Sequence, residues 1–198
     1  MAMGHFNKEI KLTKDAEIAI WRESNLVELY GTCRYGLALS AWARGFSARI
    51  LSNSEGILYE SVIEECNIGV NRAMLDFFFD HMRKRCMAAG IREEFGDVSV
   101  EAIEASLKKG EVPIVLTDAA LFGDERAPHW VIVFGVEEEK LSIINPFSGT
   151  KEIVEKVKFK TGLGYKGKAC MIAISPRTLR SEEMSHSIAV GERLLEGG

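Results

Sequence analysis

The chain has 198 residues, of which 46% are hydrophobic and 27% are charged, and its net charge is -4. These values are typical of one globular domain with its own core, and they exclude a disordered, collagen-like or coiled-coil chain. The acidic balance argues against a nucleic-acid partner, and the longest apolar runs are far shorter than the roughly 20 residues of a membrane helix.

The first 14 residues contain no apolar segment of the kind that a signal peptide requires. The four cysteines, Cys33, Cys66, Cys86 and Cys170, are spread along the chain rather than clustered. Such spacing is typical of reduced thiols and not of a disulfide framework. We therefore expect a cytoplasmic protein, and the sequence does not indicate its oligomeric state.

Four stretches carry apolar residues at helical spacing. The predicted helices cover residues 15–30, 33–44, 71–89 and 99–109, and a glycine closely follows each of them. The residues expected to face the core are Leu37, Ala38, Ala41 and Trp42 in the second helix, and Met74, Leu75, Phe78, Met82 and Met87 in the third.

Other apolar stretches have the composition and alternation of strands. They cover residues 46–51, 112–116, 129–136, 140–144 and 169–175. Helices thus come first and strands, expected to form an antiparallel sheet, come second, which predicts the α+β class. We expect one domain over residues 1–198, with a loosely amphipathic tail helix over residues 181–198.

The remaining motifs do not indicate a cofactor or a metal. Residues 162–167 match G-x-G-x-x-G, but a strand rather than a helix follows them, so a loop is predicted in place of a dinucleotide site. His81 and Cys86 lack the further ligands that a zinc site needs. We therefore expect no cofactor and no metal.

Two clusters of charged residues are expected to lie in solvent. The first is the basic run at residues 83–85, on a predicted helix face. The second lies in the loop before residue 129 and consists of Asp118, Asp124 and Glu125. This acidic loop would flank a cleft at residue 129, where it could steer a cationic substrate.

Cys33 lies at the predicted start of a helix, directly after Gly31-Thr32. A thiol there meets unpaired backbone N–H groups and the positive end of the helix dipole, which both favour the thiolate. The amide of Cys33 can also donate to a developing oxyanion. Cys33 is therefore a candidate nucleophile, although the same position also suits a small buried side chain at a helix junction.

His129 opens one predicted strand and Asn145 ends the next. A turn near residues 137–140 pairs the two strands as a hairpin, which brings Asn145 back toward His129. An amide can bond to one imidazole nitrogen and leave the other free as a base. Each residue also has an ordinary structural alternative, as a strand-entrance histidine or as a turn residue before proline. Together with Cys33, their order along the chain is that of papain-like hydrolases.

Several short stretches, in the same order, resemble the papain-like cysteine peptidases that remove bacteriocin leader peptides at a double glycine. The chain is more similar still to an uncharacterised cytosolic branch grouped with them. The matching stretches fall within residues 18–147 and are Ile20-Trp21-Arg22-Glu23, Gly31-Thr32-Cys33, Gly36-Leu37-Ala38-Leu39, Arg44-Gly45-Phe46, Pro128-His129-Trp130-Val131 and Asn145-Pro146.

The resemblance implies a papain-like fold, in which N-terminal helices carrying the cysteine pack on a C-terminal antiparallel sheet carrying the histidine and the asparagine. It also implies roles for three residues, with Cys33 as nucleophile, His129 as general base and acid, and Asn145 as orienter. Such a site would cleave a peptide, amide or isopeptide bond through a thioester, without metal or cofactor.

The sequence differs from these relatives at three places. They usually carry aspartate where this chain has Asn145, and Gly-Pro after the cysteine where this chain has Arg34-Tyr35. They also place a glutamine shortly before the cysteine as an oxyanion donor, and this chain has none there.

Neighbouring residues are candidates for the missing oxyanion and substrate contacts. Asn25 is a better donor than Glu23, because an ionised carboxylate only accepts hydrogen bonds. Trp130, next to the histidine, is a candidate substrate contact.

Three hypotheses follow. The first is a cysteine peptidase or amidase acting on a peptide-like substrate. The second is a non-catalytic peptide-binding module of the same fold, which would keep the thiol and the imidazole but leave the cysteine unactivated. The third is an acyl transferase, in which an amine rather than water resolves the thioester.

Overall fold

The computed structural model describes residues 2–10, 13–26, 31–65 and 69–177, so the predicted tail helix at 181–198 lies outside the described residues. The helices are α1 (Ala2–Phe6), α2 (Lys14–Ser24), α3 (Arg34–Ala43), α4 (Glu60–Glu65), α5 (Arg72–Ala88), α6 (Val100–Lys108) and α7 (Lys156–Thr161), with a 3-10 turn η1 (Ala119–Phe122). The strands are β1 (Phe46–Ser52), β2 (Arg92–Phe95), β3 (Val112–Asp118), β4 (Pro128–Glu137), β5 (Lys140–Asn145), β6 (Thr150–Glu155) and β7 (Cys170–Pro176).

The four predicted helices correspond to α2, α3, α5 and α6, and the five predicted strands to β1, β3, β4, β5 and β7. The first helix is shorter than predicted, because Asn25 leaves the helical region with φ -73° and ψ 141°. The unpredicted elements are short, and two of them, β2 and β6, are charged strands at the edges of the sheet. Charged edge strands protect a sheet from pairing with other chains, and they carry little hydrophobic signal.

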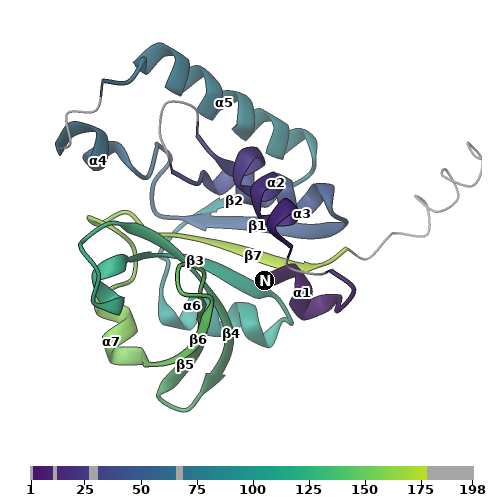
Figure 1. The fold of residues 1–198 in the computed structure, drawn as a ribbon, viewed down its shortest axis with the longest axis vertical. Helices are drawn as coiled ribbons and strands as arrows, with labels where there is room; N and C mark the ends of the chain where they lie inside the picture. Colours follow the sequence, from purple (N-terminus) through teal and green to yellow (C-terminus); the bar gives the residue numbers. More distant parts are fainter. Residues whose placement is uncertain (1, 11–12, 27–30, 66–68, 178–198) are drawn as a thin grey trace, which may run out of the picture.

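The seven strands form a single mixed sheet in the order β2-β1-β7-β3-β4-β5-β6 (Figure 1). β2 pairs with β1 in parallel, whereas the other pairs are antiparallel. The expected antiparallel sheet is therefore wrong for this one pair. The chain between β1 and β2 contains α4 and α5, and a crossover of that length permits parallel pairing.

Helices cover both faces of the sheet, as the alternation along β3 shows. Ile114 and Leu116 pack with residues of α3 and α5, whereas Val115 between them packs with residues of α6 and α7. Figure 1 shows α2, α3 and α5 beside the β1–β2 side of the sheet, away from α7. The protein is thus α+β, with a hydrophobic core on each face.

The faces of two helices differ from the predicted ones. On α5 the buried residues are Leu75, Phe79, Met82 and Cys86, while Met87 is 68% exposed. Leu75 and Met82 are therefore buried as expected, and the four positions follow the 3.6-residue period of a helical stripe that leaves Met87 outside. Apolar composition alone did not define the phase of the stripe. On α3, Ala38 and Ala41 are buried as expected and the half-buried Leu37 packs against the core. Trp42 and, on α5, Met74 were expected to face the core but are exposed.

A close contact at Gly36 holds α3 against the end of α2. A Cβ atom at this position would lie 2.4 Å from Ser24 Cα and 2.8 Å from Met82 Cε. Only glycine allows the two backbones to approach so closely. The contact fixes the first turn of α3, which Cys33 directly precedes. No helix in the described part of the chain is long and apolar enough to cross a membrane.

Candidate functional site

His129 and Asn145 are in direct contact. His129 is the second residue of β4 and Asn145 the last of β5, and the hairpin pairs Ile132 with Ile144 and Val133 with Ile143. The hairpin therefore brings the two residues together as expected, with His129 Nε2 2.8 Å from Asn145 Oδ1. Asn145 is only 4% exposed, so this contact is held inside the fold.

The hydrogen bonds of Asn145 define the tautomer of His129. Asn145 Oδ1 also accepts from the backbone N–H of Phe147 at 3.0 Å, which identifies this atom as the carbonyl oxygen. His129 Nε2 must then donate to it. The neutral imidazole therefore carries its lone pair on Nδ1, and no described residue donates a hydrogen bond to that nitrogen.

His129 lines a cavity of about 760 Å³. The walls are mainly apolar and include Ile20, Trp21, Leu37, Trp130, Ile132 and Ile174. Among the described residues that line it, Glu17 is the only carboxylate, and there is no lysine or arginine. Trp130, a predicted substrate contact, is part of this wall. The cavity suits an apolar ligand that is neutral or cationic.

Cys33 does not line this cavity. It lies at the start of α3, where it is the N-cap residue, but it is 2% exposed and lines a separate cavity of about 10 Å³ with Leu26 and Phe79. Burial raises the pKa of the Cys33 thiol to about 11, although hydrogen bonds from the backbone N–H groups of Gly36 and Tyr35 act in the opposite direction. Within the described part of the chain, no hydrogen bond joins this thiol to His129. The structure therefore brings together two of the three expected residues.

Thr32, the preceding residue, lines the His129 cavity instead. The backbone of Cys33 is extended, with φ -83° and ψ 139°, and successive side chains of an extended chain point to opposite sides. The Cys33 N–H donates to the carbonyl of Ser24 at 2.7 Å. The expectation that this amide serves as an oxyanion donor is therefore wrong for the described structure, because its hydrogen is already engaged.

The other two predicted contacts, Asn25 and Glu23, do not line the large cavity. Asn25 Oδ1 is buried, and no described residue donates a hydrogen bond to it. Glu23 accepts from Arg44 through both carboxylate oxygens and from Ser40 at 2.8 Å. The hydrogen bond from Arg44 is the main reason that the pKa of Glu23 lies below its usual value. Glu23 is thus part of an ion pair between α2 and the end of α3.

In the loop before His129, Asp118 was expected to be solvated, but it is not. This residue is buried, accepts from the Ala120 N–H at 3.1 Å, and is paired with Arg126 at 2.8 Å. Asp124 and Glu125 are exposed, as expected. The basic run at residues 83–85 was also expected to lie in solvent, but Arg83 forms an ion pair with Glu93.

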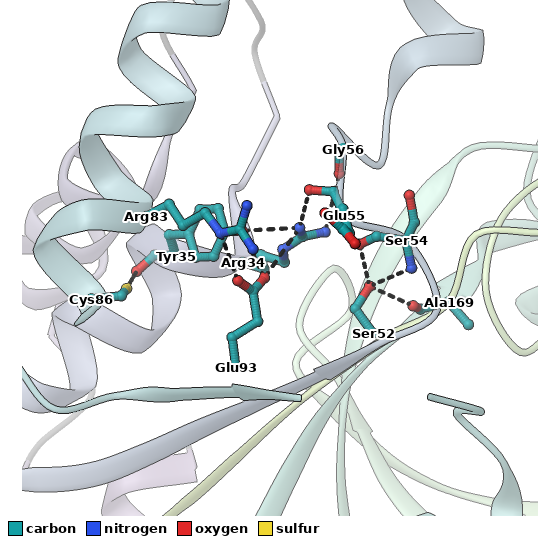
Figure 2. A network of polar contacts seen from close by, with 10 residues as sticks. All are labelled: Arg34, Tyr35, Ser52, Ser54, Glu55, Gly56, Arg83, Cys86, Glu93 and Ala169. Carbon is teal, nitrogen blue, oxygen red and sulfur yellow. Dashed lines mark hydrogen bonds and ion pairs between the residues drawn. The ribbon is translucent and has the colours of Figure 1, made fainter. Parts of the chain in front are cut away.

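A buried ionic network surrounds Arg34, the residue that follows Cys33, and sequence reasoning missed it (Figure 2). Arg34 is 1% exposed and donates to the carbonyl oxygens of Glu55 and Gly56 at 2.7 and 3.1 Å. It also lies 3.3 Å from Glu93, which accepts from Tyr35 at 2.6 Å and from Arg83 at 2.8 Å. The partners are distant in the sequence, so no local pattern indicates them.

Two motifs noted in the sequence, His81 with Cys86 and the G-x-G-x-x-G match at residues 162–167, can be compared with the structure. No group of three or more His, Cys, Asp or Glu side chains could hold a metal ion there. Residues 162–167 form the turn between α7 and β7, in which the Gly164 N–H donates to the carbonyl of Leu116. They are a loop, as predicted.

The structure is thus that of an α+β protein with a mixed seven-stranded sheet and a histidine–asparagine pair at an apolar cavity. A family model described as the Peptidase_C39 like family matches residues 1–161. The chain therefore belongs to this peptidase-related family. A search of curated proteins found no match.

Proposed function

We propose that this chain is a ligand-binding member of the Peptidase_C39 like family, which holds a peptide-like ligand in the cavity beside His129 and does not use Cys33 as a nucleophile. One observation carries the proposal: Thr32 lines that cavity, while the Cys33 side chain is buried on the other side of the extended segment. A thiol with a pKa of about 11 has almost no thiolate at neutral pH.

The cavity itself supports a binding role. Its volume of about 760 Å³ and its apolar walls fit a ligand of several residues rather than an ion or a sugar. His129 offers a lone pair on Nδ1 in a fixed orientation, because Asn145 holds Nε2. A free carboxylate on the ligand would find no lysine or arginine among the described lining residues, so the preferred ligand is neutral or cationic.

A second candidate is the cysteine peptidase or amidase, with Cys33 forming a thioester, His129 as base and Asn145 as orienter. The contact between His129 Nε2 and Asn145 Oδ1 favours it, because this is how an amide orients a catalytic imidazole. Catalysis would require the backbone at Cys33 to rotate so that its side chain reaches the cavity, which would break the hydrogen bond from the Cys33 N–H to the Ser24 carbonyl. An acyl transferase would need the same movement and would differ only in using an amine in place of water. Double-glycine leader specificity and a cytosolic location stay predictions from the resemblance.

Alkylation kinetics separate these functions. Iodoacetamide labelling at each cysteine is followed by peptide mass from pH 6 to 10, in the wild type and in His129→Ala. For a binding protein we expect slow labelling of Cys33 below pH 9, unaffected by the substitution. Rapid labelling of Cys33 below pH 7 that is lost in His129→Ala would overturn the proposal in favour of the hydrolase.

Binding is measured in parallel by calorimetry with an N-acetylated, C-amidated Ala-Leu-Phe-Ala peptide. We expect saturable binding and an intact peptide after incubation. Trp21 and Trp130 line the cavity, so their fluorescence should change with the same saturation curve. If neither this peptide nor a leucine-for-phenylalanine analogue binds at millimolar concentration, the proposed function fails.

A further inference from the structure

The peptide unit of Thr32 has an unusual arrangement at the cavity wall. Thr32 and Asn25 form an isolated antiparallel bridge. Its hydrogen bonds run from the Leu26 N–H to the Gly31 carbonyl and from the Cys33 N–H to the Ser24 carbonyl. This pattern is that of a non-hydrogen-bonded pair, in which the N–H and C=O groups of Thr32 itself point away from Asn25.

The outward side of Thr32 is the side of the cavity. Its carbonyl oxygen accepts from the Tyr59 hydroxyl and, at 3.3 Å, from Trp130 Nε1, and both of these residues line the cavity. The N–H and C=O of one residue in an extended chain point to the same side. The Thr32 N–H therefore points to the same side as its carbonyl, toward Tyr59 and Trp130, and within the described part of the chain no oxygen accepts from it.

Tyr59 is placed to hold this peptide unit in position. Its side chain is 6% exposed, its hydroxyl donates to Thr32, and it accepts from Trp130 Nε1 at 2.6 Å. Gly31 lies flat against its ring, because a Cβ at Gly31 would be 3.1 Å from Tyr59 Cε2. Tyr59 thus contacts Gly31 and Thr32 on one side and Trp130 on the other, which restrains the peptide unit of Thr32.

We propose that the Thr32 N–H and His129 Nδ1 form a subsite for the main chain of an extended, apolar peptide. The Thr32 N–H donates to a ligand carbonyl oxygen, and His129 Nδ1 accepts from a ligand N–H. An extended peptide residue presents these two groups on one side, while its side chains contact the apolar walls. Tyr59 is a positioning residue that acts through the Thr32 carbonyl. This inference rests on the proposed function, since it concerns the same cavity.

Calorimetry with the same acetylated and amidated peptide tests the subsite. Tyr59→Phe removes the donor to Thr32 but keeps the ring against Gly31, and we expect the affinity to fall about fivefold to tenfold, which corresponds to one hydrogen bond. Tyr165→Phe is the matched control, because Tyr165 is equally buried but does not line the cavity. It should bind the peptide as the wild type does.

A second series uses the unmodified protein, so that it does not depend on how a variant folds. Ester analogues replace one peptide N–H at a time by oxygen, and one of them should bind at least fivefold more weakly because His129 Nδ1 loses its donor. Equal binding of all esters, or wild-type binding by a folded Tyr59→Phe variant, would overturn the subsite while leaving the binding function intact. Loss of binding by every peptide to the wild type would instead refute the proposed function.

Discussion

Replacing Glu93 by glutamine should strongly destabilise the fold, because it removes the only carboxylate that pairs with Arg34 in the described structure. Arg34 is 1% exposed, and its guanidinium lies 3.3 Å from Glu93. At an effective dielectric constant of 20, a charge pair at this distance is worth about 5 kcal/mol. The neutral amide of the variant would still accept one hydrogen bond, from Tyr35 or from Arg83. We therefore expect Glu93→Gln to cost about 3–5 kcal/mol, as is usual when one partner of a buried pair is removed.

Urea denaturation and thermal melting measure this cost. A loss of that size should lower the melting temperature by roughly 6–20 °C for a domain of this length. Glu94→Gln is the matched control, because Glu94 is the next residue of β2 and is exposed. It should change stability by less than about 0.5 kcal/mol. Equal effects of the two substitutions would show that the network around Arg34 does not stabilise the fold as argued.

Two further predictions concern packing and thiol ionisation. Gly36→Ala should destabilise the protein by several kcal/mol in urea, because its Cβ would overlap Ser24 Cα, whereas Gly69→Ala, which meets open space, should be nearly neutral. The pKa values of the thiols of Cys33, Cys86 and Cys170 are raised by burial, to about 11, 12 and 12. The unfolded chain therefore releases these protons first, so stability should fall as the pH rises from about 9 toward 11, and a flat urea midpoint over that range would contradict the assignment.

The pairing of His129 with Asn145 could be predicted because it depends on local geometry. A tight turn fixes the register of a hairpin, and the register fixes which residues meet. The main helices and strands could likewise be predicted, because their apolar residues recur at helical or strand spacing within the segment itself. The strands β2 and β6 could not be predicted in this way, because an edge strand needs no hydrophobic alternation and is recognised only by the neighbour with which it pairs.

The direction of the Cys33 side chain could not be predicted in this way. It depends on which of the two extended residues before α3, Thr32 or Cys33, faces the cavity, and this is set by the Asn25–Thr32 bridge and by the contact of Gly36 with Ser24. A shift of one residue in an extended segment exchanges the side chains on its two faces. The buried position of Arg34 is equally invisible in the sequence, since its partners come from two distant segments.

A cysteine placed at position 32 tests directly which of these two residues faces the cavity. Because Thr32 lines the cavity beside His129, the introduced thiol of Thr32→Cys should be accessible and should have a pKa no higher than the ordinary value near 8.5. Relative to Cys33, whose pKa is about 11, a difference of about 2.5 units gives about 300-fold more thiolate at pH 7. Iodoacetamide should therefore label the introduced thiol far faster than Cys33 in the same molecule, and adding His129→Ala should slow the labelling of the introduced thiol alone. If the two thiols react at similar rates, Thr32 does not occupy the face assigned to it, and the separation of Cys33 from His129 is wrong.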